Sequence, residues 1–233
     1  MEESYAQYLL KKTQDDYNLI AKDFTRTRSF LPADIKKLAD LAKKGERILD
    51  SGCANGRLYE ALKDKDIDYF GIDFSEDLIA IAKEKYPEAK FLVSNTLNLP
   101  FPENFFDKVY SISVLHHIPS KELQLLYLKE TNRVLKPNGL LILRVWNLWK
   151  RNKTLLMILR YSFLKLIKKS RLDFFDIFLP WKDSKGKIIT ERYFHCFRKK
   201  ELELLAKKVG FKIKKIWQEG KGTKANIYLI GEK

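Results

Sequence analysis

Short apolar runs alternate with segments of helical periodicity along the middle of the chain. The runs that predict buried strands cover residues 47–51, 69–73, 90–94, 108–114 and 140–146. The segments between them that predict helices cover residues 57–65, 76–86 and 120–135, and Ser75 is placed to cap the second of these. Because parallel strands need crossover connections, this alternation predicts an α/β fold with helices on both faces of a parallel sheet.

The two ends of the chain follow other patterns. Residues 5–23 and 33–44 predict two helices before the first strand. Residues 199–209 predict a late helix that ends at Gly210, and residues 211–219 and 225–231 predict two strands joined by a short turn. We expect these two strands to form an antiparallel pair at the sheet edge, which brings the sheet to seven strands.

Residues 148–197 break the alternation. Residues 148–172 are apolar and basic, with eight Lys and Arg and no acidic residue, and residues 173–197 predict an irregular or short-stranded insert. The basic stretch is a candidate for a lid helix that meets RNA phosphates, for an amphipathic helix on an anionic membrane, or for a plain solvated face.

The net charge of +15 is concentrated at one end of the 233-residue chain. Residues 148–233 hold 23 Lys and Arg against 8 Asp and Glu, whereas the charges of residues 1–147 cancel. A one-sided basic field predicts a polyanionic partner, with nucleic acid first and a membrane surface second, although a lysine-rich soluble surface would look similar.

The composition of the chain indicates the compartment in which the protein works. Two cysteines exclude a disulfide framework, and no run of about 18 apolar residues predicts a membrane span. The N-terminal residues lack a signal-peptide pattern. We therefore expect a cytoplasmic protein.

The loop after the first strand, Asp50-Ser51-Gly52-Cys53-Ala54-Asn55-Gly56, is built from small residues that let backbone approach a ligand. It lacks the G-x-G-x-x-G dinucleotide fingerprint. Asp73 ends the second strand, where an ionised carboxylate can accept hydrogen bonds from both hydroxyls of a ribose. With no basic phosphate cradle beside it, this loop predicts a site for a nucleoside without phosphates.

These residues, with Gly71-Ile72-Asp73 and Leu99-Pro100-Phe101, resemble class I S-adenosylmethionine-dependent methyltransferases over about residues 17–147. The resemblance implies that Asp50 and the glycine loop contact the methionine part, that Asp73 holds the ribose and that Asn95 and Thr96 contact adenine. The full set of cofactor-binding residues that it implies is Tyr17, Asp50, Gly52, Cys53, Ala54, Asn55, Gly56, Asp73, Phe74, Asn95, Thr96, Leu97, Ser113 and Val114.

The sequence departs from that family pattern at two positions. Ala54 replaces a usual glycine, and Asn95 replaces a usual aspartate, which keeps an acceptor but loses the charge. Both changes are expected to weaken cofactor binding. They leave open a non-catalytic relative that keeps the fold and binds a nucleoside or tRNA.

Three further segments, at residues 17–28, 111–118 and 179–202, are similar to the tRNA wobble-uridine carboxymethyl methyltransferases. The last segment discriminates best, because many small-molecule methyltransferases share the first two. The resemblance implies methyl ester formation on a carboxymethyl group at C5 of the wobble uridine, with tRNA as partner. It also implies a small zinc-binding activator protein, which the eukaryotic relatives use. The rival is a methyltransferase for a small or lipid-like acceptor such as a quinone precursor.

A carboxylate acceptor is already ionised at neutral pH, so positioning matters more than a general base. An arginine fork suits the carboxylate, and the candidates are Arg28, Arg144 and Arg192. The remaining catalytic candidates are His116, His117 and His195, each with packing as the alternative. Candidates for substrate binding are Trp146, Trp181, Tyr193, Lys150, Arg151 and Lys153. The spacing of His195 and Cys196 predicts no metal site.

We therefore expect one methyltransferase domain over residues 1–233. Its parts are an N-terminal helical cover (1–44), a cofactor-binding core (45–147), a basic substrate-side insert (148–197) and a closing helix with an antiparallel strand pair (198–233).

Overall fold

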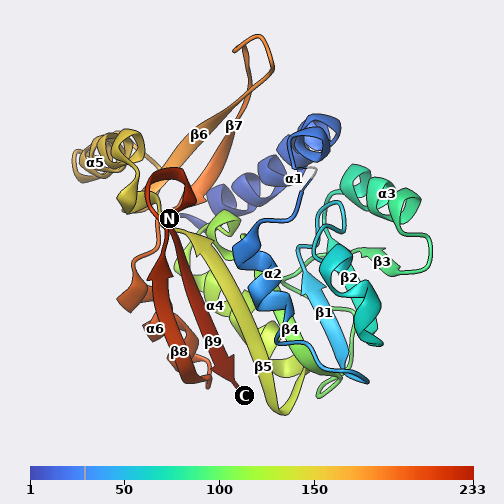
Figure 1. Cartoon of the computed structure of the whole chain (residues 1–233). Coiled ribbons are helices and arrows are strands. Elements are labelled where there is room, and N and C mark those ends of the chain that lie inside the picture. The colour runs from blue at the N-terminus through green and yellow to red at the C-terminus, as the bar shows by residue number, and fades with distance from the viewer. Residues whose placement is uncertain (29) are drawn as a thin grey trace.

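A computed structural model describes residues 1–28 and 30–233. Its centre is a seven-stranded sheet in the order β3-β2-β1-β4-β5-β9-β8, and β6 and β7 form a separate two-stranded sheet (Figure 1). The strands are β1 (Arg47–Ser51), β2 (Asp68–Asp73), β3 (Lys90–Val93), β4 (Phe106–Ile112), β5 (Leu135–Trp146), β6 (Asp176–Lys182), β7 (Ile188–His195), β8 (Lys212–Glu219) and β9 (Asn226–Glu232).

Six α-helices and five 3₁₀ turns occur within these residues. The helices are α1 (Glu3–Thr27), α2 (Ala33–Ala39), α3 (Glu76–Lys85), α4 (Lys121–Val134), α5 (Asn152–Leu166) and α6 (Lys199–Lys208). The 3₁₀ turns are η1 (Tyr59–Ala61), η2 (Lys63–Lys65), η3 (Leu115–His117), η4 (Leu148–Lys150) and η5 (Gly222–Lys224). Across the part of the chain that the structure describes, no helix is long and apolar enough to cross a membrane.

The predicted sheet is confirmed. Strands β1 to β5 run parallel, and β9 pairs antiparallel with both β5 and β8. The strand pair at the end of the chain therefore adds to the sheet edge as expected. Ser75 caps α3 through its side chain, which accepts a hydrogen bond from the backbone N–H of Leu78.

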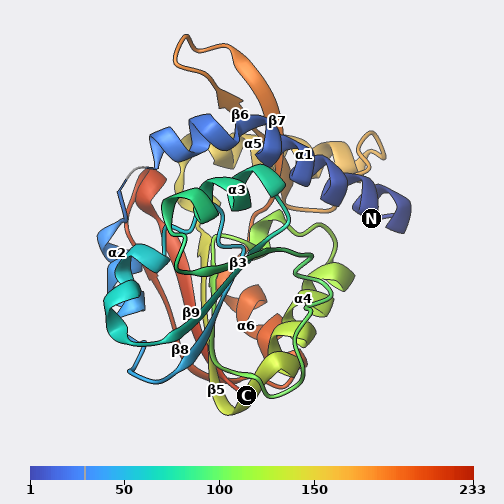
Figure 2. The same ribbon diagram turned by 90° about the vertical axis from the view of Figure 1, so that its right-hand side faces the viewer.

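Helices cover both faces of this sheet, and the alternation of side chains along each strand divides the core (Figure 2). On one face, Leu49 belongs to a cluster that includes Tyr127 of α4 and Leu205 of α6. On the other face, Ile48 belongs to a cluster that includes Ile35 of α2 and residues of α3. Adjacent side chains of β1 therefore pack into the hydrophobic clusters on opposite faces of the sheet.

One predicted helix is wrong. Residues 57–65 form η1 and η2, whose backbone bonds join residues three apart, as in Ala61 N–H to the Leu58 carbonyl. Residues three apart lie on the same side of such a turn. Tyr59 and Leu62 meet this condition, and both are buried in the same cluster.

The insert is more regular than its sequence suggests. Residues 152–166 form α5, and β6 and β7 pair antiparallel as a long hairpin. Helix α5 packs on that hairpin, since Ile158 is buried with Ile177 and Phe194. Helix α1 lies across the carboxyl ends of the central strands, where Tyr17 and Ile20 pack with Leu78 of α3 (Figures 1 and 2).

Candidate functional site

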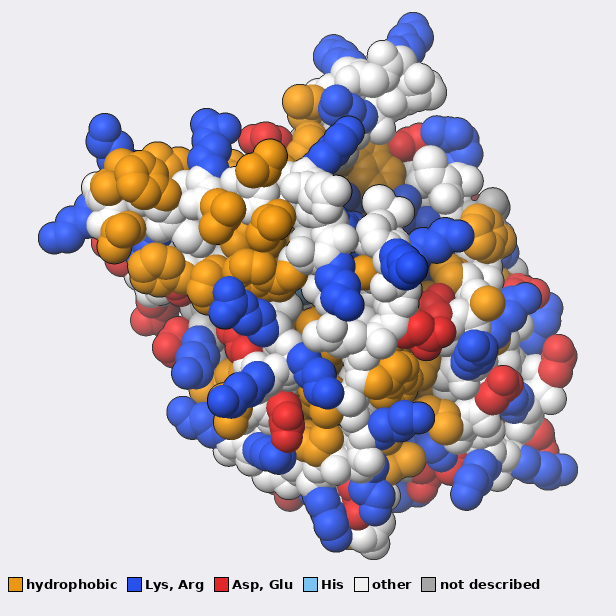
Figure 3. All heavy atoms as spheres, turned by 60° about the vertical axis from the view of Figure 1, so that its left-hand side comes forward, with side chains coloured by type: hydrophobic (Ala, Val, Ile, Leu, Met, Phe, Trp, Pro, Cys, Tyr) orange, Lys and Arg blue, Asp and Glu red, His pale blue; other side chains and the backbone are white. Residues whose placement is uncertain are grey.

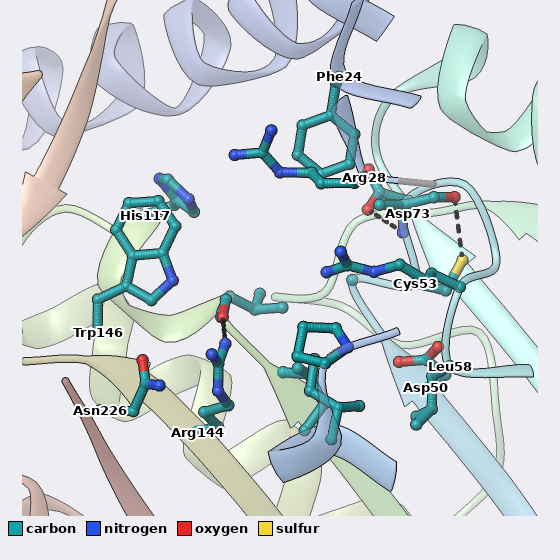
Figure 4. A pocket seen from close by; sticks show the side chains of 18 of the residues that line it. Phe24, Arg28, Asp50, Cys53, Leu58, Asp73, His117, Arg144, Trp146 and Asn226 are labelled. Carbon is teal, nitrogen blue, oxygen red and sulfur yellow. Dashed lines mark hydrogen bonds between the residues drawn. The ribbon is translucent and has the colours of Figure 1, made fainter. Parts of the chain in front are cut away.

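A cavity of about 790 Å³ opens where the central parallel strands end, beneath α1 and β7. This is the position at which open α/β sheets bind ligands. Asp50, Cys53 and Asp73 lie on one side of it, and His117, Trp146 and Asn226 lie on the opposite side (Figure 4). The predicted site residues that line it are Tyr17, Arg28, Asp50, Gly52, Cys53, Ala54, Asn55, Asp73, Phe74, Asn95, Thr96, Leu97, Ser113, Val114, His117, Arg144, Trp146, Arg151 and Arg192.

The loop after β1 requires glycine where it approaches the cavity. The backbone N–H groups of Gly52 and Cys53 both donate to the Ile72 carbonyl, at 2.8 and 2.9 Å. Gly52 has a φ of +80°, and a Cβ added there would lie 2.3 Å from Cγ2 of Val114. Ala54 has a φ of 49°, a left-handed conformation that favours glycine. The loop therefore accepts the alanine at the expense of backbone strain.

Two buried carboxylates face this half of the cavity. Asp73 accepts hydrogen bonds from the backbone N–H groups of Ala54 at 3.0 Å and Ser75 at 2.9 Å. Asp50 accepts one from the Tyr69 hydroxyl at 2.9 Å. Burial raises the pKa of Asp73 to about 6 and that of Asp50 to about 7. Hydroxyl or ammonium donors of a ligand would therefore stabilise the ionised carboxylates.

Arg192 of β7 enters the cavity at the end of a hydrogen-bonded chain. Its Nη1 donates to the Tyr17 hydroxyl at 3.2 Å, and that hydroxyl lies 2.8 Å from Nε2 of His117. His117 Nδ1 lies 3.0 Å from the Tyr193 carbonyl oxygen and donates to it. Burial and the charge of Arg192 lower the pKa of His117 to about 3. His117 is therefore neutral, and it holds Tyr17 and Arg192 in place.

The second half of the cavity carries more arginine than acid. Arg28 lies 4.5 Å from the Phe24 ring centre and 4.7 Å from that of Trp181, and its guanidinium extends between the two sides of the cavity (Figure 4). Burial lowers the pKa of Arg28, and it lowers those of Arg57 and Arg151 to about 10. Positive charge held in so dry a space favours an anionic ligand.

Arg144 also lines the cavity, but its guanidinium already has hydrogen-bond partners within the protein. Its Nε donates to Asp34 Oδ2 at 2.8 Å, and its Nη1 donates to the Ser113 hydroxyl at 2.6 Å. The Tyr228 hydroxyl donates to the same Asp34 oxygen at 2.8 Å. Of the three candidate arginines, Arg144 is thus the one whose charge is already matched by a carboxylate.

The other histidines do not line the cavity. His116 is fully buried, accepts a hydrogen bond at Nδ1 from the Trp146 backbone N–H and stacks on Phe194. Burial lowers its pKa well below the usual value. His195 lies between Asp176 at 2.7 Å and Glu201 at 3.0 Å. Burial opposes the charge of His195, but these two carboxylates outweigh it and raise its pKa to about 9.

The remaining predicted residues lie outside the cavity lining. Trp181 stands behind it, within 4.7 Å of both the Arg28 and the Arg192 guanidinium groups. Gly56 turns the loop after β1 beside Phe91, and Tyr193 is fully buried in another cluster. Lys150 and Lys153 are exposed around the start of α5.

The sequence analysis missed several polar residues of the cavity, among them Asp34, Arg57, Asn226 and Tyr228. Arg57 directly follows the glycine loop, so its position was a usable signal. The other three reach the cavity through α2 and through the pairing of β9 with β5, which no local motif reveals.

Comparisons with known proteins agree with this geometry. A family model described as a methyltransferase domain matches residues 49–143. A solved S-adenosylmethionine-dependent methyltransferase from Methanosarcina mazei aligns with a TM-score of 0.73 at 22% identity, covering 88% of this chain and 98% of that one. A putative methyltransferase from Haloferax volcanii, solved in complex with the Trm112 methyltransferase activator, gives a TM-score of 0.63 at 16% identity and covers 94% and 96%.

Three curated relatives are informative. A tRNA (carboxymethyluridine(34)-5-O)-methyltransferase from Arabidopsis thaliana is 34% identical over 60% of this chain, which spans about a third (34%) of that protein. One of the same name from Schizosaccharomyces pombe is 28% identical over 83% of this chain and 86% of its own. A 2-methyl-6-phytyl-1,4-hydroquinone methyltransferase from Synechocystis is 34% identical over 55% of this chain and 41% of its own.

Proposed function

We propose that the chain is a class I S-adenosylmethionine-dependent methyltransferase and that it methylates the carboxymethyl group of a wobble uridine in tRNA. The product would be a methyl ester. Two curated relatives carry this activity in their names, and the one from Schizosaccharomyces pombe aligns over most of both chains.

The residues on one side of the cavity fit S-adenosylmethionine. Each oxygen of Asp73 accepts one backbone N–H, so lone pairs remain for the two ribose hydroxyls. Asn55 contributes a buried Oδ1 that lacks a hydrogen-bond partner among the described residues. Gly52 lines the cavity at a φ of +80°, and Val114 packs so closely against it that only its backbone can face a ligand. We therefore assign Asp50, Asn55 and the Gly52 backbone to the methionine part as part of this proposal.

The observation that carries the choice of acceptor is Arg192. Its side chain is 5% exposed, and its Nε has no hydrogen-bond partner within residues 1–28 and 30–233. Arg28 and Arg57 line the same cavity with pKa values lowered by burial and by neighbouring arginines. A carboxylate on the acceptor would accept from Arg192 Nε and balance the buried charge of this arginine, whereas a neutral acceptor would leave that charge uncompensated.

The chemistry that this arrangement supports needs no general base. Bound S-adenosylmethionine supplies a methyl group on a sulfonium sulfur, and transfer to a carboxylate oxygen breaks the C–S bond and leaves S-adenosylhomocysteine. The acceptor arrives ionised, so the protein positions it and excludes water. Neutral His117 agrees with this, because its low pKa suits a hydrogen-bond acceptor for Tyr17 and not a proton shuttle.

The charge of the surface supports an RNA partner. Lys and Arg side chains are spread over the face of the molecule that Figure 3 presents, and the last 86 residues supply the whole net charge. Such a surface would bind the phosphates around the anticodon. We propose that the protein acts in the cytoplasm, because a tRNA substrate is present there.

Transfer of radiolabelled methyl groups from S-adenosylmethionine separates the candidate functions. The protein is incubated with bulk tRNA and with a lipid extract, and each fraction is counted before and after mild alkali. Alkali-labile label in tRNA is expected, because a methyl ester hydrolyses readily. Alkali-stable label, or label in lipid alone, would refute the proposal. Retained tRNA binding without any label would identify a non-catalytic relative.

Helix α5 favours a second candidate, a lipid-like acceptor at a membrane. Its outward side chains are apolar, and Leu156, Phe163 and Leu166 are 71%, 59% and 69% exposed (Figure 3). Basic residues flank them, as on helices that lie in an anionic lipid surface. A hydroquinone methyltransferase is among the relatives, with a match that covers 55% of this chain. The arginine-lined cavity favours the first candidate.

A protein activator remains part of the proposal. Within the described residues, β3 is one of the two outer strands of the seven-stranded sheet, and it exposes Leu92 and Val93. An open strand edge with apolar side chains can accept a strand from a partner. Co-expression with a small zinc-binding activator is expected to raise soluble yield and methyl transfer together. Unchanged soluble yield and unchanged methyl transfer would refute the proposal of an activator protein.

A further inference from the structure

Besides Arg192 Nε, the side of the cavity opposite the glycine loop holds two further buried polar atoms that lack a hydrogen-bond partner among residues 1–28 and 30–233. They are Asn226 Oδ1, an acceptor, and Arg151 Nε, a donor. Asn226 is 3% exposed and lies across the cavity from the cofactor residues Asp50 and Asp73 (Figure 4). Leaving buried polar groups unpaired is costly, so two of them lining one cavity indicate a ligand with complementary groups.

Two contacts fix the direction of the Asn226 amide. Its Nδ2 donates to the Lys224 carbonyl at 3.0 Å and to the Tyr228 hydroxyl oxygen at 3.3 Å. The Tyr228 hydroxyl donates its own proton to Asp34 at 2.8 Å, so its oxygen is left to accept. Both neighbours of Nδ2 are therefore acceptors, and the amide oxygen is the atom that faces an incoming donor.

Arg151 is anchored at the same place. Its Nη2 donates to the Thr223 carbonyl at 2.9 Å, in the turn η5 that also holds Asn226 through Lys224. Its guanidinium lies 4.6 Å from the centre of the Trp146 ring. The register of β5 and β9 pairs Trp146 directly with Asn226, which places both side chains on one face of the sheet. A fixed donor and a fixed acceptor therefore flank Trp146.

We propose that Asn226 and Arg151 read the hydrogen-bonding edge of the acceptor base and select uracil over cytosine. This inference rests on the proposed function. Uracil presents N3–H, which Asn226 Oδ1 accepts, next to a carbonyl oxygen, which accepts from Arg151 Nε. Cytosine presents a lone pair at N3, which would face the Asn226 oxygen and leave both acceptors unpaired. These residues set specificity and take no part in the methyl transfer itself.

The test uses anticodon stem-loop RNAs that carry 5-carboxymethyluridine at the wobble position, with or without a methyl group on N3. Replacing the N3 proton is expected to lower kcat/KM of the wild-type protein at least about ten-fold. Asn226→Ala is expected to lower kcat/KM on the unblocked RNA by a similar factor and then to be nearly indifferent to the N3 methyl group. Asn152→Ala, at an exposed asparagine that begins α5, is the matched control.

Each outcome decides. Equal activity of the wild-type protein on both RNAs overturns the inference and leaves the proposed function standing. An Asn226→Ala variant that still discriminates as the wild-type protein does also overturns it. Absence of transfer to either RNA overturns the proposed function, and this inference with it. Unchanged affinity for S-adenosylhomocysteine shows that the Asn226→Ala variant is folded. If the variant does not fold, the comparison of the two RNAs with the wild-type protein still tests the inference.

Discussion

Arg192 is the residue whose replacement should separate acceptor binding from cofactor binding. Its guanidinium lies 4.7 Å from the Trp181 ring centre and 5.2 Å from that of Phe194, and it donates to the Tyr17 hydroxyl. Arg192→Gln keeps part of the aliphatic stem in this aromatic setting and removes the fork and the charge. The variant should therefore remain folded but lose its hold on the acceptor carboxylate.

The size of the effect follows from the number of bonds lost. A charge-assisted hydrogen bond contributes about 1.5–3 kcal/mol, and the planar fork of Arg192 can make two of them to one carboxylate. A loss of about 3–5 kcal/mol corresponds to a fall of about a hundred- to several-thousand-fold in kcat/KM. Because the guanidinium is almost fully buried, water cannot replace these bonds cheaply.

The assay measures initial rates of ester formation on 5-carboxymethyluridine RNA, beside calorimetric affinity for S-adenosylhomocysteine. Arg192→Gln should lose activity by the factor above and keep its affinity within about two-fold, while Arg192→Lys should recover part of the rate. Arg47→Gln, at the half-buried arginine that begins β1 at the amino end of the strand, is the matched control. Parallel loss of activity and cofactor affinity would mark Arg192 as structural and refute the reasoning.

Three other perturbations have expected outcomes. Gly52→Ala places a Cβ 2.3 Å from Val114 Cγ2 at a φ of +80°, so calorimetry should show loss of S-adenosylhomocysteine binding; ordinary affinity would contradict the loop geometry. The pKa of His195 is about 9 in the folded protein, against 6.5 when it is unfolded. The stabilisation that protonated His195 gives is therefore complete below pH 6.5 and is lost as the pH rises through 9. Urea denaturation should show a decline of about 2–3 kcal/mol over that window that His195→Gln lacks. Raising salt from about 50 to 200 mM should weaken tRNA binding at least about a hundred-fold, and a flat response would argue against phosphate contacts.

The sequence was sufficient for the parts of the structure that local patterns determine. The five apolar runs became β1 to β5 because buried parallel strands need continuous apolar residues. Gly52 and Asp73 could be placed because a tight strand-to-helix loop and the end of a neighbouring strand have recognisable sequences. Both residues line the cavity.

Long-range pairing determines the rest. Asn226 and Tyr228 face the cavity because β9 pairs with β5 in one particular register, which no local pattern encodes. Arg144 looked equivalent to Arg192 in the sequence, yet Asp34, 110 residues away in the chain, already pairs with it. His195 lies in the segment that discriminates best between methyltransferase families, but it pairs with Asp176 and Glu201 and does not line the cavity. In each case the deciding neighbour is distant in sequence.

Nucleoside analysis of a defined substrate tests the central claim most directly. Anticodon RNA with a single 5-carboxymethyluridine is incubated with the protein and S-adenosylmethionine, digested and examined by mass spectrometry. Conversion of that nucleoside to its methyl ester, with every other nucleoside unchanged, is the predicted result. An unaltered carboxymethyluridine, or a methyl group on any other nucleoside, would contradict an account built on a carboxylate held by Arg192.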